Sequence, residues 1–584
     1  MFTKRLHAAV LGLALAACSL SAAEDKADFR FVSQSDAERY LTGVFQTDSS
    51  ATMYIWSTDY VFRPGNAFTL RWTVNPNNDL YPYTIFAYRV NNQTGAKSYL
   101  PGGTSTATDI FGNDASTGFQ PTLLPTASKA VLIGEGGRFP AVTIPNELGM
   151  HTVVVELRDY LGGRVIKRAY WKLSVVDGNE VIPNSITTEV RLVNTKSYTL
   201  RGNTFVTGNG RLIIEPGTVI KGEPGSDPTS YLNVSRGAQL IANGTQSRPI
   251  IFTSSRPIGQ RSRGDWGGIQ LLGAAPTNWP TEPKAEGQVT DERVNYGGNN
   301  ATSSCGSIRY VRIEFAGARF TATNELNGLA FYGCGSGTVT DHIQVHYAAD
   351  DSFEWFGGTN DGKYLVSTYN ADDQFDWTYG YSGRLQYLVG IHNQDPGGNG
   401  IEADNSDQGF GLRPISRPTL FNLTLIGGAK DDSSRGARLR AGTSASLNNL
   451  VLTGWVDEGL RIETTESYAE VDANRFVANG VLLWNNRGNG QTITAQTDAT
   501  TLPVLQGTRG SWTNIVSANP MLRRVQFSDP DFRPMPTSPV FRAGWVQPPD
   551  DGFFDQNAYY MGALGEDNWL EEWTLILLES DLNP

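Results

Sequence analysis

The sequence predicts an all-β protein with an N-terminal β-sandwich followed by a right-handed parallel β-helix. The main observation is an internal repeat, because the motif Ala349–Trp355 recurs 22 residues later as Ala371–Trp377. Each copy follows an apolar strand-like run without helical spacing. A period of this size is typical of a solenoid, whose units bury their apolar faces only by stacking on their neighbours. Short strands and turns also fill the chain before the repeat, which is the second observation.

Residues 1–18 are typical of a targeting segment, with a positively charged start and an apolar run too short to span a bilayer. The segment ends in Leu-Ala-Ala-Cys, which matches the bacterial lipobox, so we expect lipidation at Cys18. Ser19 then favours an outer-membrane lipoprotein, periplasmic or surface-exposed, that is anchored by lipid and does not span the membrane. The alternative is cleavage after Ala23, which produces a secreted protein.

Residues 19–28 are small and charged and are expected to form a tether. Between residues 29 and 177, short runs of roughly alternating apolar and polar residues, such as Ala67–Val74 and His151–Leu157, are separated by turn signals. This pattern is typical of an immunoglobulin-like β-sandwich of ordinary size. A hinge is expected where this region ends.

The β-helix is predicted from residue 186 to residue 545. Runs such as Arg211–Ile220 couple a β-rich stretch to a Gly or Asn corner. Residues 276–304 are rich in Pro, Asn, Gly and charge, so we expect a loop inserted between rungs. Residues 546–584 are predicted to cap the stack, with a short helix near residues 569–578, because an open solenoid end exposes unpaired strand edges.

Composition and cysteine usage exclude several classes of protein. The formal net charge is −12 and the chain has no basic run, so we expect no nucleic-acid partner. Beyond the lipobox only Cys305 and Cys334 remain, and in an exported protein they predict one disulfide, with two buried free thiols as the alternative. Haem-attachment spacing, P-loop and dinucleotide fingerprint are all missing from the sequence, so we expect neither haem nor a nucleotide cofactor.

Three segments and the doubled acid motif resemble a known family. The segments are Gly264–Ile269 (GDWGGI), Ile308–Gly317 (IRYVRIEFAG) and Met561–Trp569 (MGALGEDNW). They look like a largely uncharacterised family of exported bacterial right-handed parallel β-helix surface proteins and lipoproteins, within the pectin-lyase-like class. The resemblance covers roughly residues 200 to 575. That class contains polysaccharide lyases, hydrolases, epimerases and adhesins, so the fold alone does not select an activity.

Alignment of the second strand of successive rungs predicts one outward column of charged side chains, because side chains alternate along a strand. The column is expected to contain Glu354, Asp376, Glu402, Arg438 and Arg461. Adjacent rungs lie about 5 Å apart, and carboxylates at that spacing either shift a pKa or call for a cation. A protonated and an ionised carboxyl form the acid/base pair of glycoside hydrolysis. The candidate catalytic residues are therefore Glu354, Asp376, Glu402 and Arg438.

The corners before these strands supply candidate metal ligands, whose oxygens suit calcium. These ligands are Asp350, Asp351, Asp372 and Asp373. The alternative interpretation is structural, because Asp at a solenoid corner often caps turn amides. In lyases of the resembled class, calcium and an Arg or Lys base neutralise and deprotonate a uronate, and Arg438 and Arg440 resemble that arrangement, although no complete lyase signature is present.

Three further residues are candidates for ligand binding. Tyr379 and Tyr381 come just after the second acidic strand, where exposed rings stack on sugars, and Arg440 lies beside the column.

Three functional hypotheses follow. The first is a cell-surface lipoprotein whose β-helix binds an extracellular polysaccharide or another surface partner, with calcium at the acidic ladder. The second is a glycan-active hydrolase or polysaccharide lyase that uses the same ladder. The third is a structural or adhesive surface protein, in which the acids form only a solvated face.

Overall fold

The computed structural model describes residues 52–75, 84–99, 122–123, 137–138, 142–144, 146–158, 165–225, 229–287, 290–320, 324–392, 398–428, 434–486, 499–525, 529–542 and 544–577. The signal segment, Cys18 and the tether lie outside the described residues. The chain divides into two compact units. The first contains residues 1–58, 65–145 and 151–173, and the second contains residues 59–64, 146–150 and 174–584.

The first unit consists of β-strands that pair mainly antiparallel, as β1 with β4, β5 with β10 and β5 with β6. Its strands are β1 (Thr52–Ser57), β3 (Ala67–Phe68), β4 (Leu70–Asn75), β5 (Thr84–Asn91), β6 (Lys97–Tyr99), β7 (Thr122–Leu123), β8 (Gly137–Arg138), β9 (Val142–Thr143), β10 (Gly149–Arg158) and β11 (Val165–Val175). This agrees with an all-β region, and the immunoglobulin-like topology stays a prediction. No helix of the described residues is long and apolar enough to cross a membrane.

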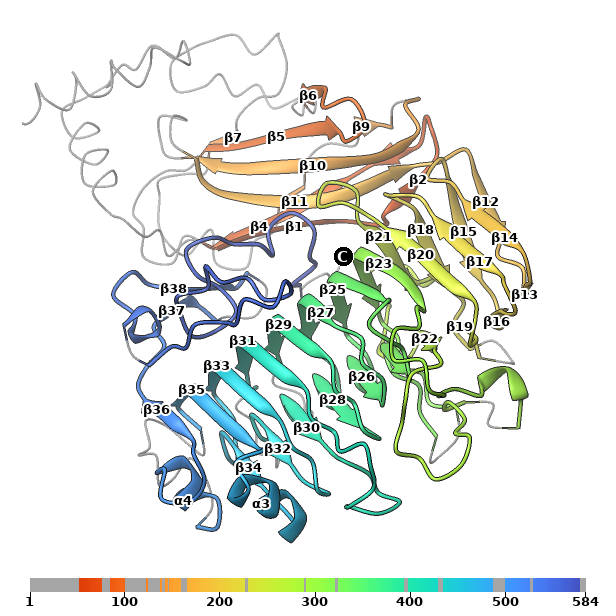
Figure 1. Cartoon of the computed structure of the whole chain (residues 1–584). Coiled ribbons are helices and arrows are strands. Elements are labelled where there is room, and N and C mark those ends of the chain that lie inside the picture. The colour runs from red at the N-terminus through yellow and green to blue at the C-terminus, as the bar shows by residue number, and fades with distance from the viewer. Residues whose placement is uncertain are drawn as a thin grey trace, which may run out of the picture. The chain divides into compact units, whose positions relative to one another are not determined.

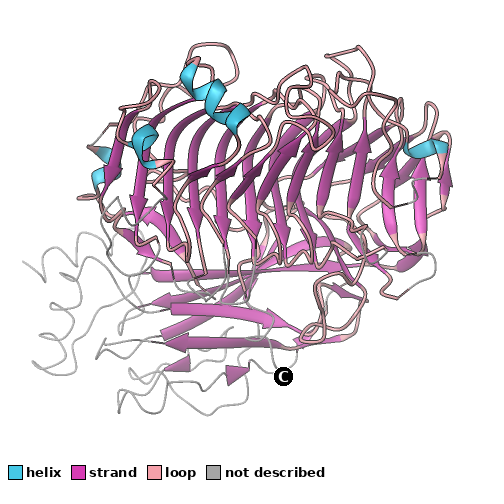
Figure 2. Cartoon of the chain, turned by 90° about the horizontal axis from the view of Figure 1, so that it is seen from below, coloured by secondary structure: helices cyan, strands magenta, loops and turns pink. Residues whose placement is uncertain are grey.

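The second unit is a parallel β-helix, consistent with the predicted right-handed coil (Figure 1). One face is a ten-stranded sheet, in order β13 (Ser185–Ile186), β16 (Asn203–Val206), β19 (Tyr231–Val234), β22 (Ile269–Leu272), β24 (Leu329–Tyr332), β26 (Phe353–Phe356), β28 (Phe375–Thr378), β30 (Ile401–Ala403), β32 (Arg438–Leu439) and β34 (Arg461–Ile462). Successive coils contribute neighbouring strands, which Figure 2 shows as a row of parallel arrows.

The remaining faces belong to a fifteen-stranded sheet. Its strands are β12 (Gly178–Val181), β14 (Glu189–Leu192), β15 (Lys196–Leu200), β17 (Arg211–Ile214), β18 (Val219–Gly222), β20 (Gln239–Asn243), β21 (Ile250–Ser254), β23 (Gly306–Glu314), β25 (Val339–His346), β27 (Gly362–Thr368), β29 (Arg384–Ile391), β31 (Thr419–Ile426), β33 (Ser446–Thr453), β35 (Val477–Trp484) and β36 (Thr513–Ser517). The coil therefore begins a few residues before the predicted start at residue 186.

Short elements complete this unit. They are β2 (Val61–Phe62), the 3-10 helices η1 (Glu292–Val294) and η3 (Pro539–Phe541), the α-helices α3 (Thr465–Asp472) and α4 (Leu502–Leu505), and the antiparallel pair β37 (Leu522–Arg524) and β38 (Asp531–Pro534).

Equivalent apolar residues stack along the inside of the coil, and this stacking fixes the register of the acidic motifs. Phe353 pairs with Phe375 and Trp355 pairs with Trp377 in neighbouring strands, and all four side chains are fully buried. The phenyl rings of Phe353 and Phe375 stack with centroids 5.4 Å apart. Because residues alternate along a strand, the acid between each aromatic pair faces outward.

The Gly-Asp-Trp-Gly-Gly segment shared with the resembled family serves the fold. The buried Asp265 carboxylate accepts hydrogen bonds from the Ser254 hydroxyl (2.6 Å) and the Ser262 amide (3.0 Å). The Trp266 indole N–H donates to the Glu314 carbonyl at 2.8 Å inside the core. At Gly268, φ is +95° and an added Cβ would lie 2.1 Å from the Asn327 carbonyl oxygen, so the neighbouring coil excludes a side chain there.

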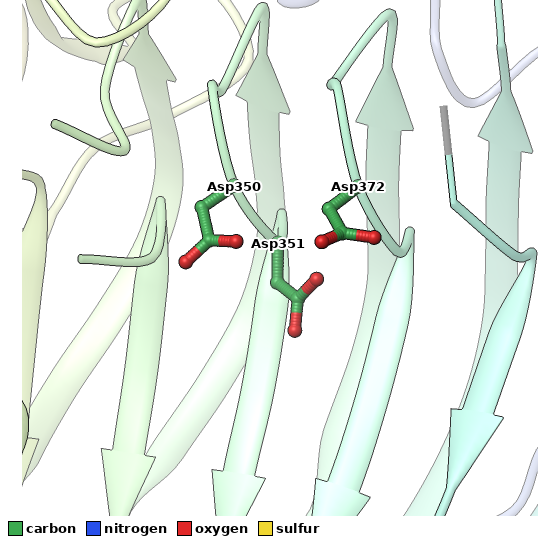
Figure 3. A group of neighbouring side chains, drawn as sticks. All are labelled: Asp350, Asp351 and Asp372. Atoms are coloured by element: carbon green, nitrogen blue, oxygen red, sulfur yellow. The ribbon is translucent and has the colours of Figure 1, made fainter. Parts of the chain in front are cut away.

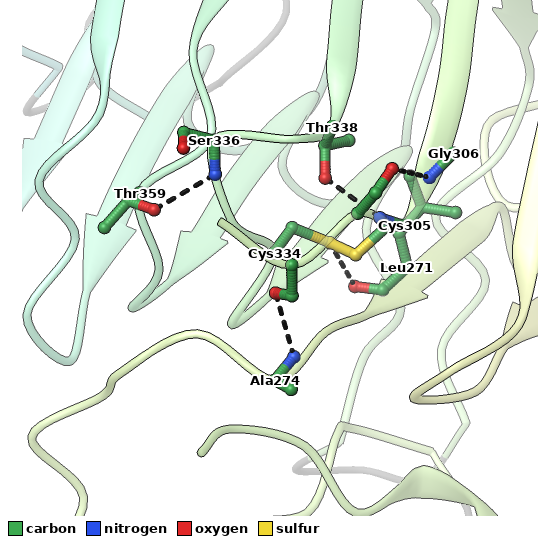
Figure 4. The surroundings of a disulfide bond; sticks show 10 residues. Leu271, Ala274, Cys305, Gly306, Cys334, Ser336, Thr338 and Thr359 are labelled. Atoms are coloured by element: carbon green, nitrogen blue, oxygen red, sulfur yellow. Dashed lines mark hydrogen bonds between the residues drawn. A yellow bond between two sulfur atoms is a disulfide. The ribbon is translucent and has the colours of Figure 1, made fainter. Parts of the chain in front are cut away.

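A disulfide joins Cys305 and Cys334, with their Cα atoms 5.9 Å apart (Figure 4). This confirms the predicted pair and rules out the alternative of two free thiols. The bond ties the start of β23 to the residues that follow β24, where the inserted loop of residues 276–304 rejoins the coil.

The C-terminal segment differs from the predicted end cap. It runs back along the outer face of the fifteen-stranded sheet, where amide side chains hold its backbone: Asn449 bonds Val546, Asn422 bonds Tyr560 and Gln344 bonds Leu575. Residues 569–573 form turns and residues 574–577 have no regular secondary structure, so the expected helix is not found there. The reason is apolar burial, because outward valines of that sheet pack with tail residues such as Leu570 and Trp573 in one buried cluster.

Candidate functional site

The structure places the predicted column on the outer face of the ten-stranded sheet. The register pairs Glu354 with Asp376, Asp376 with Glu402, Glu402 with Arg438, and Arg438 with Arg461. The five charged residues therefore lie in one line across five coils, in the predicted order. Whether they act in catalysis stays a prediction.

The half of the column near Arg438 is electrically compensated. The Glu402 carboxylate pairs with the guanidinium of Arg438 at 3.2 Å and also with that of Arg440. Arg440 bonds Asp404 at 2.8 Å, and Arg438 bonds Glu463 at 3.2 Å. Each arginine is thus held between two carboxylates, and Glu402 is an ion-pair partner within this network.

The other half of the site gathers carboxyl groups that have no direct ion-pair partner among the described residues. We call the following six carboxylates the acidic cluster: Asp350, Asp351, Glu354, Asp372, Asp373 and Asp376. Three overlapping triads place their ligand oxygens within 4.8 Å of one another: Asp350–Asp351–Asp372, Asp351–Glu354–Asp376 and Asp373–Asp376–Glu402. In the part of the chain that the structure describes, no member of the acidic cluster forms an ion pair with Lys, Arg or His. Figure 3 shows Asp350 and Asp372 on matching corners of adjacent coils, with Asp351 between them.

Burial raises the pKa of each carboxyl in the acidic cluster, and neighbouring acids raise it further. Burial and the charges of Glu286 and Asp372 raise the pKa of Asp350 to about 8. Burial, with Glu402 and Glu325 nearby, raises the pKa of Asp372 to about 6. These directions mean that the carboxyl groups resist full ionisation together unless a bound cation or protons offset their repulsion.

The second acid of each motif also has the structural role that was considered as an alternative. Asp351 Oδ1 accepts a hydrogen bond from the Asp373 amide at 2.9 Å, one coil further on. Asp373 Oδ1 accepts from the Asn399 side-chain amide at 2.9 Å, and Asn399 Oδ1 accepts from the Arg435 amide at 3.1 Å. These corner residues link neighbouring coils through side-chain hydrogen bonds. The hydrogen bonds described for Asp351 and Asp373 use only Oδ1 of each carboxylate.

Asp376 stands apart from these corner residues. Its Oδ1 is buried and has no hydrogen-bond partner among the described residues. Burial and the charges of Glu402 and Asp373 raise the pKa of this carboxyl well above its ordinary value. A desolvated acceptor without a donor costs free energy, about 1–3 kcal/mol, so this oxygen is suited to a metal ion or to a hydroxyl donor from a ligand.

Glu286 is a site residue that the sequence did not reveal. The column position before Glu354 is held by Ala330, and the inserted loop brings Glu286 to the same region. The Glu286 carboxylate accepts from the Tyr332 hydroxyl at 2.9 Å and from Asn327 Nδ2 at 3.2 Å. The same Asn327 amide donates to Glu354 at 2.5 Å, and burial raises the pKa of Glu286 to about 7.

The two predicted tyrosines have different environments. Tyr381 is fully buried, stacks on Trp355 with centroids 5.3 Å apart, and donates to the Asn360 carbonyl at 2.9 Å. This corrects the expectation of an exposed ring, because the Tyr381 ring packs with the buried aromatic stack inside the coil. Tyr379 is only half-buried, and its hydroxyl donates to Asp407 at 2.9 Å. Arg440 lies beside the charged column, where it forms ion pairs with Asp404 and Glu402.

The arginines are poorly suited to act as bases. Burial lowers the pKa of Arg438, but its hydrogen bond with Glu463 and the charge of Glu402 outweigh burial and leave the pKa above its ordinary value. The pKa of Arg440 is likewise raised, since Asp404 and Glu402 outweigh burial. A lyase base must lose its proton, and these ion pairs oppose that loss.

A family model described as "Pectate-lyase like beta helix domain" matches residues 184–517. The matched range runs from the first strand of the ten-stranded sheet to the end of β36 and includes the acidic cluster. No curated protein and no solved structure matched the chain in the corresponding searches.

Proposed function

Because the chain belongs to the family of pectate-lyase-like β-helix domains, we propose that it binds an extracellular glycan on the outer face of the ten-stranded sheet. A divalent cation held by the acidic cluster would link the protein to the glycan. Membership in this family supports a function directed at glycans. The acidic residues of this chain support the role of the cation.

One observation carries the proposal: the acidic cluster has no basic partner among the described residues, and it includes the buried, unpartnered Asp376 Oδ1. Carboxylates grouped in overlapping triads, with ligand oxygens within 4.8 Å of one another in each triad, repel one another and also repel any acidic sugar. A hard cation with oxygen ligands removes both problems, and calcium accepts six to eight oxygens in flexible geometry. The cation would retain open coordination positions for sugar carboxylates or hydroxyls.

The test is calcium binding by the purified full chain. Isothermal titration with calcium chloride would compare the wild type with Asp376→Asn, which keeps the size of the side chain and removes its charge. Asp472→Asn is the matched control, because Asp472 is an exposed acid on α3 paired with Arg509. We expect the wild type and the control to bind calcium and Asp376→Asn to bind at least tenfold more weakly. A wild type that binds no calcium would overturn the cation role.

A second arm tests the glycan. Affinity electrophoresis through gels that contain polygalacturonate, alginate or a neutral hydroxyethyl cellulose would be run with calcium and with chelator. We expect calcium-dependent retardation in an acidic polysaccharide. Equal mobility in every gel would leave an adhesive or structural role as the better explanation of the fold.

Hydrolysis is the alternative that a specific observation favours. Glu354 and Asp376 lie opposite each other in adjacent strands, and burial raises the pKa of both carboxyls. A carboxyl pair separated by about 5 Å suits retaining glycoside hydrolysis. A reducing-end assay on the same polysaccharides, with Glu354→Gln as the inactive variant, tests this alternative. An assay for unsaturated products tests the lyase hypothesis. This hypothesis is weaker than the hydrolase hypothesis, because both candidate arginine bases are ion-paired.

We also propose that the protein is anchored to the outer membrane through a lipidated Cys18. The lipobox supports this proposal. Labelling cells with an alkyne fatty acid should mark the wild type and leave Cys18→Ala unlabelled. Release of the wild type into the medium without any label would favour the secreted alternative.

A further inference from the structure

An aromatic pair lies beside the acidic cluster, and nothing in the preceding proposal uses it. We infer that Trp279 and Tyr379, with the Asp407 carboxylate, form a subsite that stacks on one pyranose ring of the bound glycan. The inference rests on the proposed glycan-binding function and adds the residues that would recognise a sugar ring next to the cation.

The subsite is continuous with the charged column. Tyr379 directly follows β28, the strand that carries Asp376. Its ring lies 6.0 Å from that of Phe356, which stacks on Tyr332 at 4.3 Å between centroids. The Tyr332 hydroxyl in turn donates to Glu286. The pKa of Tyr379 is raised by burial first, then by Asp407, and also by the charges of Glu354 and Glu286, which shows that these acids lie within electrostatic reach.

Two chain segments far apart in sequence build the subsite. Trp279 comes from the inserted loop, and its indole meets the Tyr379 ring edge-to-face with centroids 4.6 Å apart. The neighbouring Asn278 amide N–H donates to the Tyr379 carbonyl at 2.9 Å, and its buried side chain donates to Asn405 Oδ1 at 2.9 Å and to the Pro414 carbonyl at 3.0 Å. The loop is thereby fixed to two later coils.

Glycines permit this close packing. An added Cβ at Gly357 would lie 2.7 Å from a Thr277 methyl group, and one at Gly380 would lie 2.7 Å from the Pro414 carbonyl oxygen. Both glycines have positive φ, which side chains rarely adopt. The aromatic pair is therefore held in place before any ligand arrives, and preorganisation of this kind reduces the ordering cost of binding.

The chemistry of the pair suits a sugar ring. Trp279 and Tyr379 are both only partly buried, and each combines an apolar ring with a polar group. Asp407 is exposed, and its described hydrogen bonds, from the Tyr379 hydroxyl at 2.9 Å and the Gln408 amide at 3.0 Å, both end on Oδ1. Oδ2 can then accept a sugar hydroxyl while the C–H face of the pyranose rests on an aromatic ring. Aromatic lining with a few fixed polar groups is the usual composition of a small-ligand site.

The experiment uses the calcium-loaded full chain in the three polysaccharide gels named above. The variants are Trp279→Ala and Asp407→Asn. Tyr559→Ala is the control, because Tyr559 is an aromatic residue of the C-terminal segment with 49% of its surface exposed. Calcium titration of every variant shows whether the fold and the acidic cluster are intact.

We expect the wild type and Tyr559→Ala to be retarded alike by an acidic polysaccharide. Trp279→Ala should bind that polysaccharide about tenfold more weakly, because truncating an aromatic side chain that the ligand covers commonly costs this much affinity. Its calcium affinity should be unchanged. Asp407→Asn should weaken retardation by a smaller factor. If Trp279→Ala and Asp407→Asn are retarded like the wild type, the aromatic subsite is overturned and the glycan function stands. If the wild type is not retarded in any gel, both fail together.

Discussion

Replacing Asp350 by Asn should stabilise the calcium-free protein at alkaline pH. The pKa of Asp350 rises from 3.8 to about 8 because of burial first and then the charges of Glu286 and Asp372. A carboxyl whose pKa is higher in the folded state takes up a proton on folding. Asp350 therefore lowers the free energy of unfolding as the pH rises: the loss is absent below the unfolded-state pKa of 3.8 and complete above the folded-state pKa of about 8.

The magnitude follows from the size of the shift. One pKa unit corresponds to about 1.4 kcal/mol, so a rise of this size costs on the order of 6 kcal/mol at pH 8.5. Neighbouring acids share that cost, because removing one charge also lowers the pKa of the others. We therefore expect Asp350→Asn to gain about 2–5 kcal/mol of unfolding free energy at pH 8.5 without metal, and almost nothing at pH 4.

Urea unfolding of the β-helix in chelator, followed by tryptophan fluorescence between pH 4 and 8.5, measures this difference. Asp472→Asn should track the wild type throughout, because it removes an acid outside the cluster. In saturating calcium the wild type should be more stable to urea than Asp350→Asn, because the wild type then holds its cation and the variant lacks one ligand. A chelated wild type that becomes more stable as pH rises from 5 to 8.5 would refute the reasoning.

Three further predictions concern the fold. Trp377→Ala should cost about 3–5 kcal/mol in urea unfolding, because the indole is fully buried in the stack; a cost below about 1 kcal/mol would contradict its core role. Cys305→Ser should cost about 3–4 kcal/mol, since the disulfide closes a separation of 29 residues, and the wild type in reductant should then match the variant. Truncation before residue 544 should expose the valines that pack with Leu570 and Trp573, so binding of a hydrophobic dye should rise; unchanged dye binding would contradict that packing.

The outward column is the part of the site that sequence pattern was able to predict. Alternation along each strand and a 22-residue period place Glu354 next to Asp376, and a parallel register then carries the column on to Glu402 and Arg438. The prediction succeeds because both steps are local: one concerns a strand and the other concerns its nearest neighbour in the stack. The disulfide between Cys305 and Cys334 is predicted by counting the cysteines of a chain that is expected to be exported.

Tyr381, Glu286 and Trp279 were not within reach of that reasoning. The pattern predicts Tyr381 at the surface, but its ring packs in the core against Trp355. Glu286 and Trp279 belong to an inserted loop without periodicity, so their sequence positions contain no information about the coil they meet. The small Ala330 in the column leaves room for another side chain to approach there, and it is a signal that the sequence contains.

Periodic burial of apolar side chains is a property of neighbouring residues, so the amino-acid pattern predicts that this chain coils, which face of each coil is apolar, and which acids share a column. The tertiary structure sets the electrostatic surroundings of those acids. It paired Glu402 with arginines from later coils, left Asp376 Oδ1 without a hydrogen-bond partner among the described residues, and folded a loop and the C-terminal segment onto opposite sheets. Such pairings depend on contacts between distant segments, and their energies arise only when the coils are stacked and water is excluded.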